Sequence, residues 1–486
     1  MREKLLRERC SHSSGKMAEY KNYYFLGIGG IGMSAIARYF NNAGYSVSGY
    51  DRTPSPLTAR LEQEGISIHY EDRPDLIPQD VESTFVIYTP AIPADLEEFK
   101  TVFAKGYNVC KRSRALGEIA RKQKCLAVSG THGKTTTSTL LAHILTEGGR
   151  GCNAFLGGIS KNYDTNLLLS KEPVLVAEAD EFDRSFLQLF PEIAVITATD
   201  ADHLDIYKDH SHVIEAFGEF ASQVSESGAV IIKKGVTVPR EGIKARVYSY
   251  SYDQPCDFFA SDIVPVEGGY FDFTVNSPMG RIEHCRVGVP GWVNVENAIA
   301  ASACALLHGI EPEALRKALA SFRGVKRRFD IHVNTPKVAY VDDYAHHPNE
   351  IKAAISSIRN IFAGRRICGI FQPHLYTRTR DFADEFAEAL SGLDELIMLP
   401  IYPARELPIE GVNAEMVFDK VTISDKHLVS KEQLLDTIKS LDIDCLVTIG
   451  AGDIERFINP IAKPDFLRNH LPYSKQCHTR ILQICV

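Results

Sequence analysis

The sequence lacks several features that would place it in other protein classes. Its 11 cysteines include no C-x-x-C pair and no metal-ligand spacing, which favours free thiols in a reducing compartment. No apolar run reaches the roughly eighteen residues that a membrane-spanning helix needs. The 54 lysines and arginines are outnumbered by 62 acidic residues, so the chain lacks the basic surplus of a nucleic-acid-binding protein. We therefore expect a protein of a reducing compartment that neither inserts into a membrane nor binds nucleic acid.

The length of 486 residues predicts more than one domain. Repeatedly, an apolar and β-branched run leads into a glycine or polar cluster and then into a helical pattern. Such units begin near Tyr23, Cys125 and Cys445. Strands that alternate with helices are typical of α/β domains with parallel sheets, which bind ligands at the carboxyl ends of their strands. The basic residues 1–16 lack a long apolar stretch, so we expect no secretory signal there.

The first unit contains a glycine turn of the kind that binds nucleotide phosphates. Gly27, Gly29 and Gly32 fit the pattern G-x-G-x-x-G after a predicted strand, and Asp51 follows the next strand. In a dinucleotide-binding domain such a turn holds a diphosphate at a helix N-terminus. The same glycines would also let a helix pack closely against its strand. An NAD-dependent dehydrogenase would explain this turn but none of the later motifs.

A second phosphate-binding loop occurs in SGTHGKTTT, between a predicted strand and a predicted helix. Gly130 and Gly133 would let backbone N–H groups surround phosphate oxygens. Lys134 would then reach the terminal phosphates, and the hydroxyl of Thr135 would ligate Mg²⁺. The loop is shorter than the usual G-x-x-x-x-G-K-[ST] motif, because position 128 is a valine. A regulatory nucleotide switch that makes no product would share this loop.

Acidic residues follow the next two predicted strands. If these strands flank the strand of the phosphate loop, their side chains converge at its rim, where carboxylate oxygens and a histidine nitrogen suit Mg²⁺. The first cluster contains Glu178, Asp180, Glu181 and Asp183, and the second contains Asp200, Asp202, His203 and Asp205. Each carboxylate alone would be an ordinary solvated charge, but the two clusters together predict a metal site.

The last unit carries two polar groups that suit a further ligand. In DDYAHHP, two aspartates and two histidines precede Pro348, which is positioned to begin a helix. These four side chains, Asp342, Asp343, His346 and His347, would either serve a ligand or be structural. The second group consists of Arg378 and Arg380 in YTRTRD. Their guanidinium groups suit bidentate carboxylate recognition, although two solvated arginines at a helix start would look the same.

With these motifs in this order, the chain resembles the Mur ligase family over about residues 22–466. The resemblance rests on GIGGIGMS, SGTHGKTTT, AEADE, DADHLD, NVENAIAA, RRF, DDYAHHP and FQPHLYTRTR, and the combination of GTHGKTTT with DDYAHHP is highly specific. It implies an α/β protein of three domains. These are a Rossmann-like UDP-sugar-binding domain (17–120), a central P-loop ATPase domain with a mostly parallel sheet (121–328) and a Rossmann-like amino-acid-binding domain (329–466). Residues 1–16 and 467–486 would be non-functional or disordered tails.

The resemblance also implies an activity. Such a ligase uses ATP to activate the lactyl carboxylate of UDP-N-acetylmuramate as an acyl phosphate, which the amine of L-alanine attacks, in peptidoglycan precursor synthesis for the bacterial cell wall. The cofactors would be ATP and Mg²⁺, with Mn²⁺ as a substitute. The enzyme would be a cytoplasmic monomer or homodimer. The alternative within the family is a murein peptide ligase, which attaches a preformed peptide to the same sugar.

Residue roles follow from the resemblance, position by position. The residues matching the ATP site are Gly130, Thr131, His132, Gly133, Lys134, Thr135, Thr136, Asn294, Asn297 and Arg327. The metal ligands would be Thr135, Glu178 and His203, and the UDP-sugar site would use Gly27, Gly29, Gly30, Gly32 and Asp51. The catalytic residues would be Lys134, His347, Arg378 and Arg380, with His347 as a candidate base for the amine. Ala198 and Val293 depart from the family pattern, which often has asparagine and histidine there.

Overall fold

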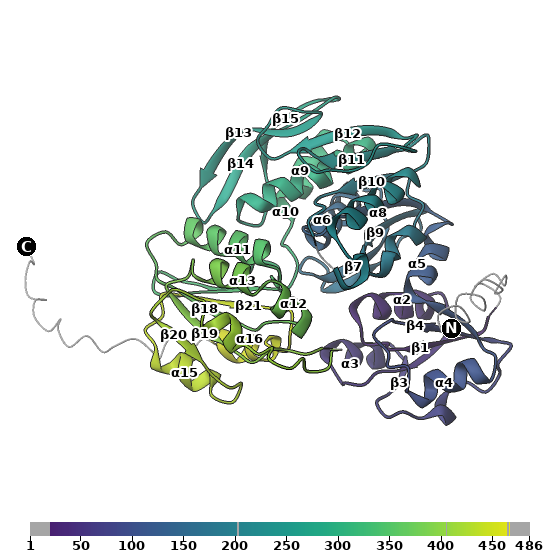
Figure 1. Cartoon of the computed structure of the whole chain (residues 1–486). Coiled ribbons are helices and arrows are strands. Elements are labelled where there is room, and N and C mark those ends of the chain that lie inside the picture. The colour runs from purple at the N-terminus through teal and green to yellow at the C-terminus, as the bar shows by residue number, and fades with distance from the viewer. Residues whose placement is uncertain (1–19, 202–203, 405, 464–465, 467–486) are drawn as a thin grey trace, which may run out of the picture. The chain divides into compact units, whose positions relative to one another are not determined.

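The computed structural model describes residues 20–201, 204–404, 406–463 and 466. It contains three β-sheets, each accompanied by helices (Figure 1). The chain divides into two compact units, Met1–Lys326 and Arg327–Val486. The first unit holds two of the sheets, and the second holds the third.

The first sheet has five parallel strands in the order β3-β2-β1-β4-β5. The strands are β1 (Asn22–Leu26), β2 (Ser46–Tyr50), β3 (Ser67–His69), β4 (Thr84–Tyr88) and β5 (Asn108–Lys111), and the α-helices are α2 (Ile31–Asn42), α3 (Pro56–Gln63), α4 (Glu97–Ala104) and α5 (Arg112–Ala120). Successive side chains of β1 point to opposite faces, so Tyr23 packs in one apolar cluster and Tyr24 in another. Parallel pairing also brings the carboxyl ends of β1, β4 and β5 side by side.

The second sheet has ten strands in the order β15-β14-β13-β12-β11-β10-β6-β9-β7-β8. Its strands are β6 (Lys124–Ser129), β7 (Asn153–Ser160), β8 (Thr165–Leu168), β9 (Val174–Ala179), β10 (Ile193–Ile196), β11 (Ala229–Lys233), β12 (Arg246–Ser251), β13 (Phe258–Val266), β14 (Tyr270–Ser277) and β15 (Gly280–Arg286). Pairing is antiparallel only at the two edges. Its helices are α6 (Lys134–Glu147), α7 (Leu204–Tyr207), α8 (His210–Ser222), α9 (Trp292–Leu307) and α10 (Pro312–Ser321). The apolar side chains of α6 and α9 share one core cluster.

The third sheet has six strands in the order β16-β17-β21-β18-β19-β20, parallel except at the β16 edge. The strands are β16 (Asp330–Asn334), β17 (Ala339–Asp343), β18 (Ile367–Phe371), β19 (Glu395–Met398), β20 (Lys426–Leu428) and β21 (Cys445–Ile449). The helices are α11 (Pro348–Ile361), α12 (Tyr376–Asp381), α13 (Ala383–Leu390), α14 (Glu415–Phe418), α15 (Leu434–Ser440) and α16 (Glu455–Ala462). Apolar clusters on both faces of the sheet bury its strands.

The predicted α/β class with mostly parallel sheets is confirmed. Pro348 begins α11, as its place in the sequence predicts. Within the described residues, no helix combines the length and apolar character needed to cross a bilayer. The predicted tails, 1–16 and 467–486, lie outside the described residues. The predicted domain boundaries stay predictions.

Candidate functional site

The phosphate loop joins β6 to α6 and depends on two glycines. Gly130 has a φ of +134° and Gly133 a φ of +79°, conformations that favour glycine. A side chain at Gly130 would also collide with Thr197, since its Cβ would lie 2.1 Å from the Thr197 Oγ1 atom. No side chain caps the N-terminus of α6. Its first N–H groups are therefore available to phosphate oxygens, as a P-loop requires.

Both acidic clusters follow strands that flank the loop. Strands β9 and β10 pair with β6 on its two sides, which is the arrangement that the metal-site prediction required. Glu178 lies at the end of β9 and accepts a hydrogen bond from the Thr135 hydroxyl at 3.1 Å. Its second oxygen accepts the N–H of Gly157, also at 3.1 Å. Glu178 is thus fixed beside the hydroxyl that the loop would offer to a metal ion.

These donors fit Mg²⁺, which prefers carboxylate and hydroxyl oxygens. His203, the third predicted ligand, lies outside the described residues, as does Asp202. Asp200 instead contacts the His132 imidazole at 3.3 Å. Among the described residues, no group of three or more histidine, cysteine, aspartate or glutamate side chains is arranged to hold a metal ion. The metal site therefore stays a prediction for Thr135, Glu178 and His203.

Lys134 forms an ion pair inside the loop. Its ammonium group lies 2.7 Å from Oε2 of Glu181 and 2.7 Å from the carbonyl oxygen of Gly130. Burial alone would lower the pKa of Lys134, but the carboxylates of Glu181, Asp180 and Glu178 outweigh this effect and raise it above its ordinary value. The lysine is therefore charged at neutral pH, as phosphate binding requires. Glu181 was predicted only as a member of the acidic cluster, and its pairing with Lys134 was not anticipated.

Helix α9 brings the two predicted adenine-site asparagines to the loop. Asn297 accepts a hydrogen bond from the Thr137 hydroxyl at 3.2 Å, and its Oδ1 atom would lie 3.0 Å from a Cβ at Gly133. Asn294, one turn earlier, donates to the carbonyl oxygen of Pro290 at 2.6 Å. Asn297 thus contacts α6 directly. Its Nδ2 atom lies 3.5 Å from Oδ1 of Asn294 and donates to it.

The glycine turn of the first sheet follows β1. Gly27 has a φ of +85°, and a Cβ there would lie 2.6 Å from Thr89. The N–H of Gly29 donates to Asp51 at 2.7 Å, and the other carboxylate oxygen of Asp51 accepts the N–H of Thr53 at 3.1 Å. Asp51 therefore holds the turn in shape, a role that its spacing did not predict.

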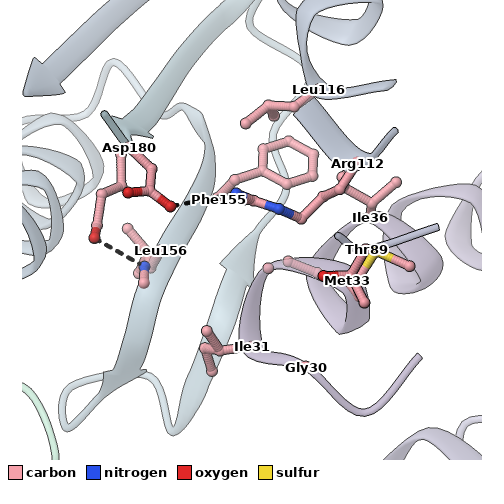
Figure 2. A pocket seen from close by; sticks show the side chains of 14 residues that line it. Gly30, Ile31, Met33, Ile36, Thr89, Arg112, Leu116, Phe155, Leu156 and Asp180 are labelled. Carbon is pink, nitrogen blue, oxygen red and sulfur yellow. Dashed lines mark hydrogen bonds and ion pairs between the residues drawn. The ribbon is translucent and has the colours of Figure 1, made fainter. Parts of the chain in front are cut away.

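A cavity of about 270 Å³ connects the glycine turn with the end of β9. Figure 2 shows Arg112 reaching across it toward Asp180, with Gly30 and Ile31 on the α2 side. Glu178, beside the phosphate loop, lines the same cavity. Arg112 was missed in the sequence because it belongs to no phosphate motif. The order of strands β1, β4 and β5 brings it to the glycine turn.

The second unit contains the DDYAHHP cluster. Asp342 is fully buried and accepts hydrogen bonds from the Thr448 hydroxyl at 2.6 Å and from the Arg327 guanidinium at 3.2 Å. Asp343 accepts the N–H groups of Phe329 and Ala345. Burial raises the pKa of Asp343 to about 7. Both aspartates therefore hold the start of this unit together.

The two histidines have different hydrogen bonds and hence different tautomers. Nδ1 of His346 lies 3.0 Å from the carbonyl oxygen of Tyr344 and must donate to it, which leaves the lone pair on Nε2. Burial lowers the pKa of His346 to about 4. Nδ1 of His347 instead accepts the N–H of Asn349 and caps α11. The proton of neutral His347 is therefore on Nε2, so while the cap is intact His347 has no lone pair to act as a base.

Adjacent arginines also differ. Arg327 donates to Asp342, to Glu455 at 3.2 Å and to the carbonyl oxygen of Gly450 at 2.7 Å. Arg328 places its guanidinium over the Tyr344 ring at 4.9 Å. Among the residues that the structure describes, Arg328 has no hydrogen bond or ion pair. Arg327 thus fixes the domain internally, and Arg328 keeps its donors available.

The two predicted carboxylate-binding arginines lie on α12. Arg378 is buried. Burial is the main cause of the lowered pKa of His346, and the charge of Arg378 lowers this pKa further. Arg380 is half exposed and pairs with Asp381 at 2.7 Å. The structure therefore brings Arg378 to the histidine cluster, whereas Arg380 is engaged with its neighbour in sequence.

A phosphate-binding loop, a second glycine turn and three β-sheets with their helices are the features of a multidomain nucleotide-binding protein. Three family models match in succession: "Mur ligase family, catalytic domain" over residues 22–124, "Mur ligase middle domain" over 128–305 and "Mur ligase, glutamate ligase domain" over 327–452. The chain belongs to the Mur ligase family, so the predicted family and its three-domain α/β fold are confirmed.

Two curated relatives are named UDP-N-acetylmuramate–L-alanine ligase. The one from Porphyromonas gingivalis is 50% identical over 448 residues, covering 91% of this chain and 98% of the relative. The one from Parabacteroides distasonis is 51% identical over 446 residues, covering 90% and 96%. Among solved structures, the UDP-N-acetylmuramate–alanine ligase of Thermotoga maritima aligns with a TM-score of 0.76 at 27% identity, covering 90% of this chain and 98% of that one. A murein peptide ligase from Psychrobacter arcticus shares the fold, with a TM-score of 0.69 at 22% identity over 91% of this chain and 98% of its own.

Proposed function

We propose that the chain is an ATP-dependent ligase that joins L-alanine to the lactyl carboxylate of UDP-N-acetylmuramate, in peptidoglycan precursor synthesis. The names of the relatives support this activity over attachment of a preformed peptide. The observation that carries it is the cavity, because Glu178, a predicted metal ligand, and the glycine turn line the same space. A sugar nucleotide bound at the turn could therefore present its acid to the phosphates of ATP.

In the first step, a lactyl carboxylate oxygen attacks the γ-phosphorus of ATP. The bond to the β-phosphate oxygen breaks, ADP leaves, and an acyl phosphate forms. Lys134 and the N–H groups at the start of α6 neutralise and orient the phosphates. Thr135 and Glu178, with His203 as predicted, would hold Mg²⁺, which supplies charge neutralisation on the phosphate oxygens. The lysine must exchange Glu181 for phosphate oxygens when ATP binds.

In the second step, the uncharged amine of L-alanine attacks the acyl carbon and a tetrahedral intermediate forms. The acyl C–O bond then breaks, inorganic phosphate leaves, and the nitrogen loses its extra proton to solvent. We assign the carboxylate of alanine to Arg378, which is buried near His346. Arg380 stays a prediction for the same site. His347 carries its proton on Nε2 and is proposed as a hydrogen-bond donor there instead of a base.

An arginine from the domain boundary was predicted to bind the ATP phosphates. Arg327 would have to break three interactions to do so. We therefore propose Arg328 for this role, because its guanidinium donors are available among the described residues. Mg²⁺ dependence, a monomeric or homodimeric state and a place in the cytoplasm complete the proposal.

The test is an assay of phosphate release from ATP with UDP-N-acetylmuramate and one amine at a time, followed by mass measurement of the product. The amines are L-alanine, glycine, L-serine and the tripeptide L-alanyl-γ-D-glutamyl-meso-diaminopimelate. We expect the alanyl product to dominate. Product from the tripeptide alone would establish the peptide-ligase alternative, and phosphate release without any product would favour a regulatory switch.

A further inference from the structure

A buried asparagine joins the two sheets of the first unit. Asn166 belongs to β8, the edge strand of the second sheet, and is 0% exposed. Its side chain forms hydrogen bonds with α2, the helix that follows the glycine turn of the first sheet. The proposed function gives this residue no role, and it lies outside every motif of the sequence.

Three partners fix the orientation of the Asn166 amide. Its Nδ2 atom lies 2.7 Å from the carbonyl oxygen of Ile31 and 3.0 Å from the Ser34 hydroxyl. Its Oδ1 atom lies 3.2 Å from Nη1 of Arg38, which also donates to the Thr165 hydroxyl at 2.6 Å. A carbonyl oxygen only accepts and a guanidinium only donates, so the amide must donate to α2 at one end and accept from it at the other.

The contacts between α2 and β8 form a buried network. Ser34 is fully buried, and Arg38 and Thr165 are nearly so. Arg38 extends the network, because its Nε atom pairs with Glu64 at 2.6 Å. A buried polar group that loses its partner is costly, so each member of the network restrains the others. Directional hydrogen bonds therefore hold the start of α2 against β8.

Strand pairing extends this restraint to the phosphate-loop side of the cavity. The antiparallel register places Asn166 opposite residues 156–159 of β7. Within that stretch, Gly157 lines the cavity and donates its N–H to Glu178 at 3.1 Å. Ile31 lines the same cavity from the side of α2. A continuous path of hydrogen bonds and strand pairing thus runs from the helix after the glycine turn to the predicted metal ligand.

We propose that Asn166 is a positioning residue, which fixes the distance between a sugar nucleotide at the glycine turn and the phosphates at the loop without touching either. The inference rests on the proposed function for the identity of these two substrates. Reacting atoms must approach to about 3.5 Å, and a misplacement of about 1 Å can lower the rate about a hundredfold. Loss of Asn166 should therefore lower kcat while each substrate still binds.

The test compares N166A with N41A, a matched variant that removes another amide partner of the same helix. Asn41 donates to the carbonyl oxygen of Glu64 at 2.9 Å, so N41A leaves the hydrogen bonds between α2 and β8 in place. We expect N166A to lower kcat by about 10- to 100-fold. The dissociation constants of N166A for UDP and for ATP, each measured alone by calorimetry, should change by less than about threefold.

N41A should lower the midpoint of thermal unfolding but keep kcat within about threefold of the wild type. A kcat of N166A no lower than that of N41A would show a merely structural role and overturn the proposal. Weaker UDP binding in step with the loss of kcat would also overturn it, because Asn166 would then shape the sugar-nucleotide site itself.

S34A carries the test if N166A does not fold. It removes one acceptor of Asn166, retains the bond to Ile31, and places a good helix former in α2. We expect a fall of about three- to tenfold in kcat, the usual effect of one hydrogen bond, with unchanged affinities for UDP and ATP. A wild-type kcat in S34A would contradict the proposal.

Hydrogen exchange measures the positioning itself and needs no turnover. In N166A, the amides in the first turns of α2 and in β8 should exchange about tenfold faster than in the wild type. In N41A, the amides of β8 should exchange at the wild-type rate. Unchanged exchange in N166A would show that Asn166 does not hold these elements together. This result stands even if the wild-type chain makes no alanyl product, an outcome that would refute the proposed function alone.

Discussion

Nζ of Lys134 lies 2.7 Å from Oε2 of Glu181, a carboxylate that is only 1% exposed. The loop lysine therefore has a buried counter-charge before any phosphate reaches it. ATP must compete with this carboxylate for the lysine, and Glu181 sets part of the cost of nucleotide binding. The pairing follows from the sheet order, because β9 lies directly beside β6.

The variant E181Q tests this competition. We expect the free protein to lose about 2 kcal/mol of stability, because the buried ammonium loses a charged hydrogen bond. ATP should bind about tenfold more tightly, since phosphate oxygens no longer displace a carboxylate. Thermal unfolding with and without ATP, together with calorimetric titration, measures both effects. E219Q, which removes an exposed carboxylate paired with Arg184, is the control. Weaker ATP binding to E181Q would mean that Glu181 supports the lysine in its bound position.

The two boundary arginines should separate into a structural and a functional residue. R327Q leaves the fully buried Asp342 without its guanidinium partner, so we expect a loss of about 3 kcal/mol in the stability of the second unit. R328Q removes no hydrogen bond among the described residues, but it removes the charge that lowers the pKa of Asp343 against the effect of burial, so we expect a smaller loss of about 1 kcal/mol. If Arg328 binds the ATP phosphates as proposed, R328Q should lower kcat by at least about tenfold, because one stabilising charge is lost. Chemical unfolding and steady-state kinetics of both variants measure these effects. Full activity of R328Q would contradict its proposed role.

Asp343 should make the second unit sensitive to pH. Burial raises its pKa to about 7, from an ordinary value of 3.8, so the folded state binds this proton more tightly than the unfolded chain does. The resulting stabilisation is complete below about pH 4 and is lost as the pH rises to about 7. His346 has the opposite effect on stability. Burial lowers its pKa from 6.5 to about 4, so the folded state binds this proton less tightly than the unfolded chain does, and stability increases as the pH rises through this range.

The variant D343N isolates the carboxyl group from this opposing effect. The stability of the wild type relative to D343N should fall between about pH 4 and pH 7 and stay constant above it. Urea unfolding of both proteins across that range measures the difference. D384N, at an exposed aspartate paired with Lys420, should show no such change. A constant difference between wild type and D343N would mean that Asp343 ionises in its ordinary range.

The phosphate loop could be predicted from the sequence because its glycines, lysine and threonine act through local backbone geometry. Gly130 and Gly133 have the positive φ values that such a loop needs. Partners contributed by other strands could not be predicted in this way. Glu181 meets Lys134, and Arg112 meets Gly32, only because of the order in which strands pair. The sequence also does not show whether Arg327 or Arg328 forms hydrogen bonds within the second unit, because these bonds depend on the folded structure.

The role of His347 as the N-cap of α11 is visible in the residues that follow it in the sequence. The residues after it, Pro348 and Glu350, are those of a helix start with a capping box, and the structure contains that box. Two adjacent histidines suggest acid–base chemistry. In the structure, however, Nδ1 of His347 accepts the N–H of Asn349 at the start of α11.

The central claim is that the lactyl carboxylate attacks the γ-phosphate of ATP directly, as the cavity shared by the glycine turn and Glu178 would allow. It is tested by supplying UDP-N-acetylmuramate labelled with ¹⁸O in its lactyl carboxylate, with ATP and L-alanine, and measuring the mass of the released phosphate. Attack by the carboxylate predicts one ¹⁸O atom in each phosphate, because the acyl C–O bond breaks when the amine attacks. Unlabelled phosphate accompanying full formation of the alanyl product would contradict the account.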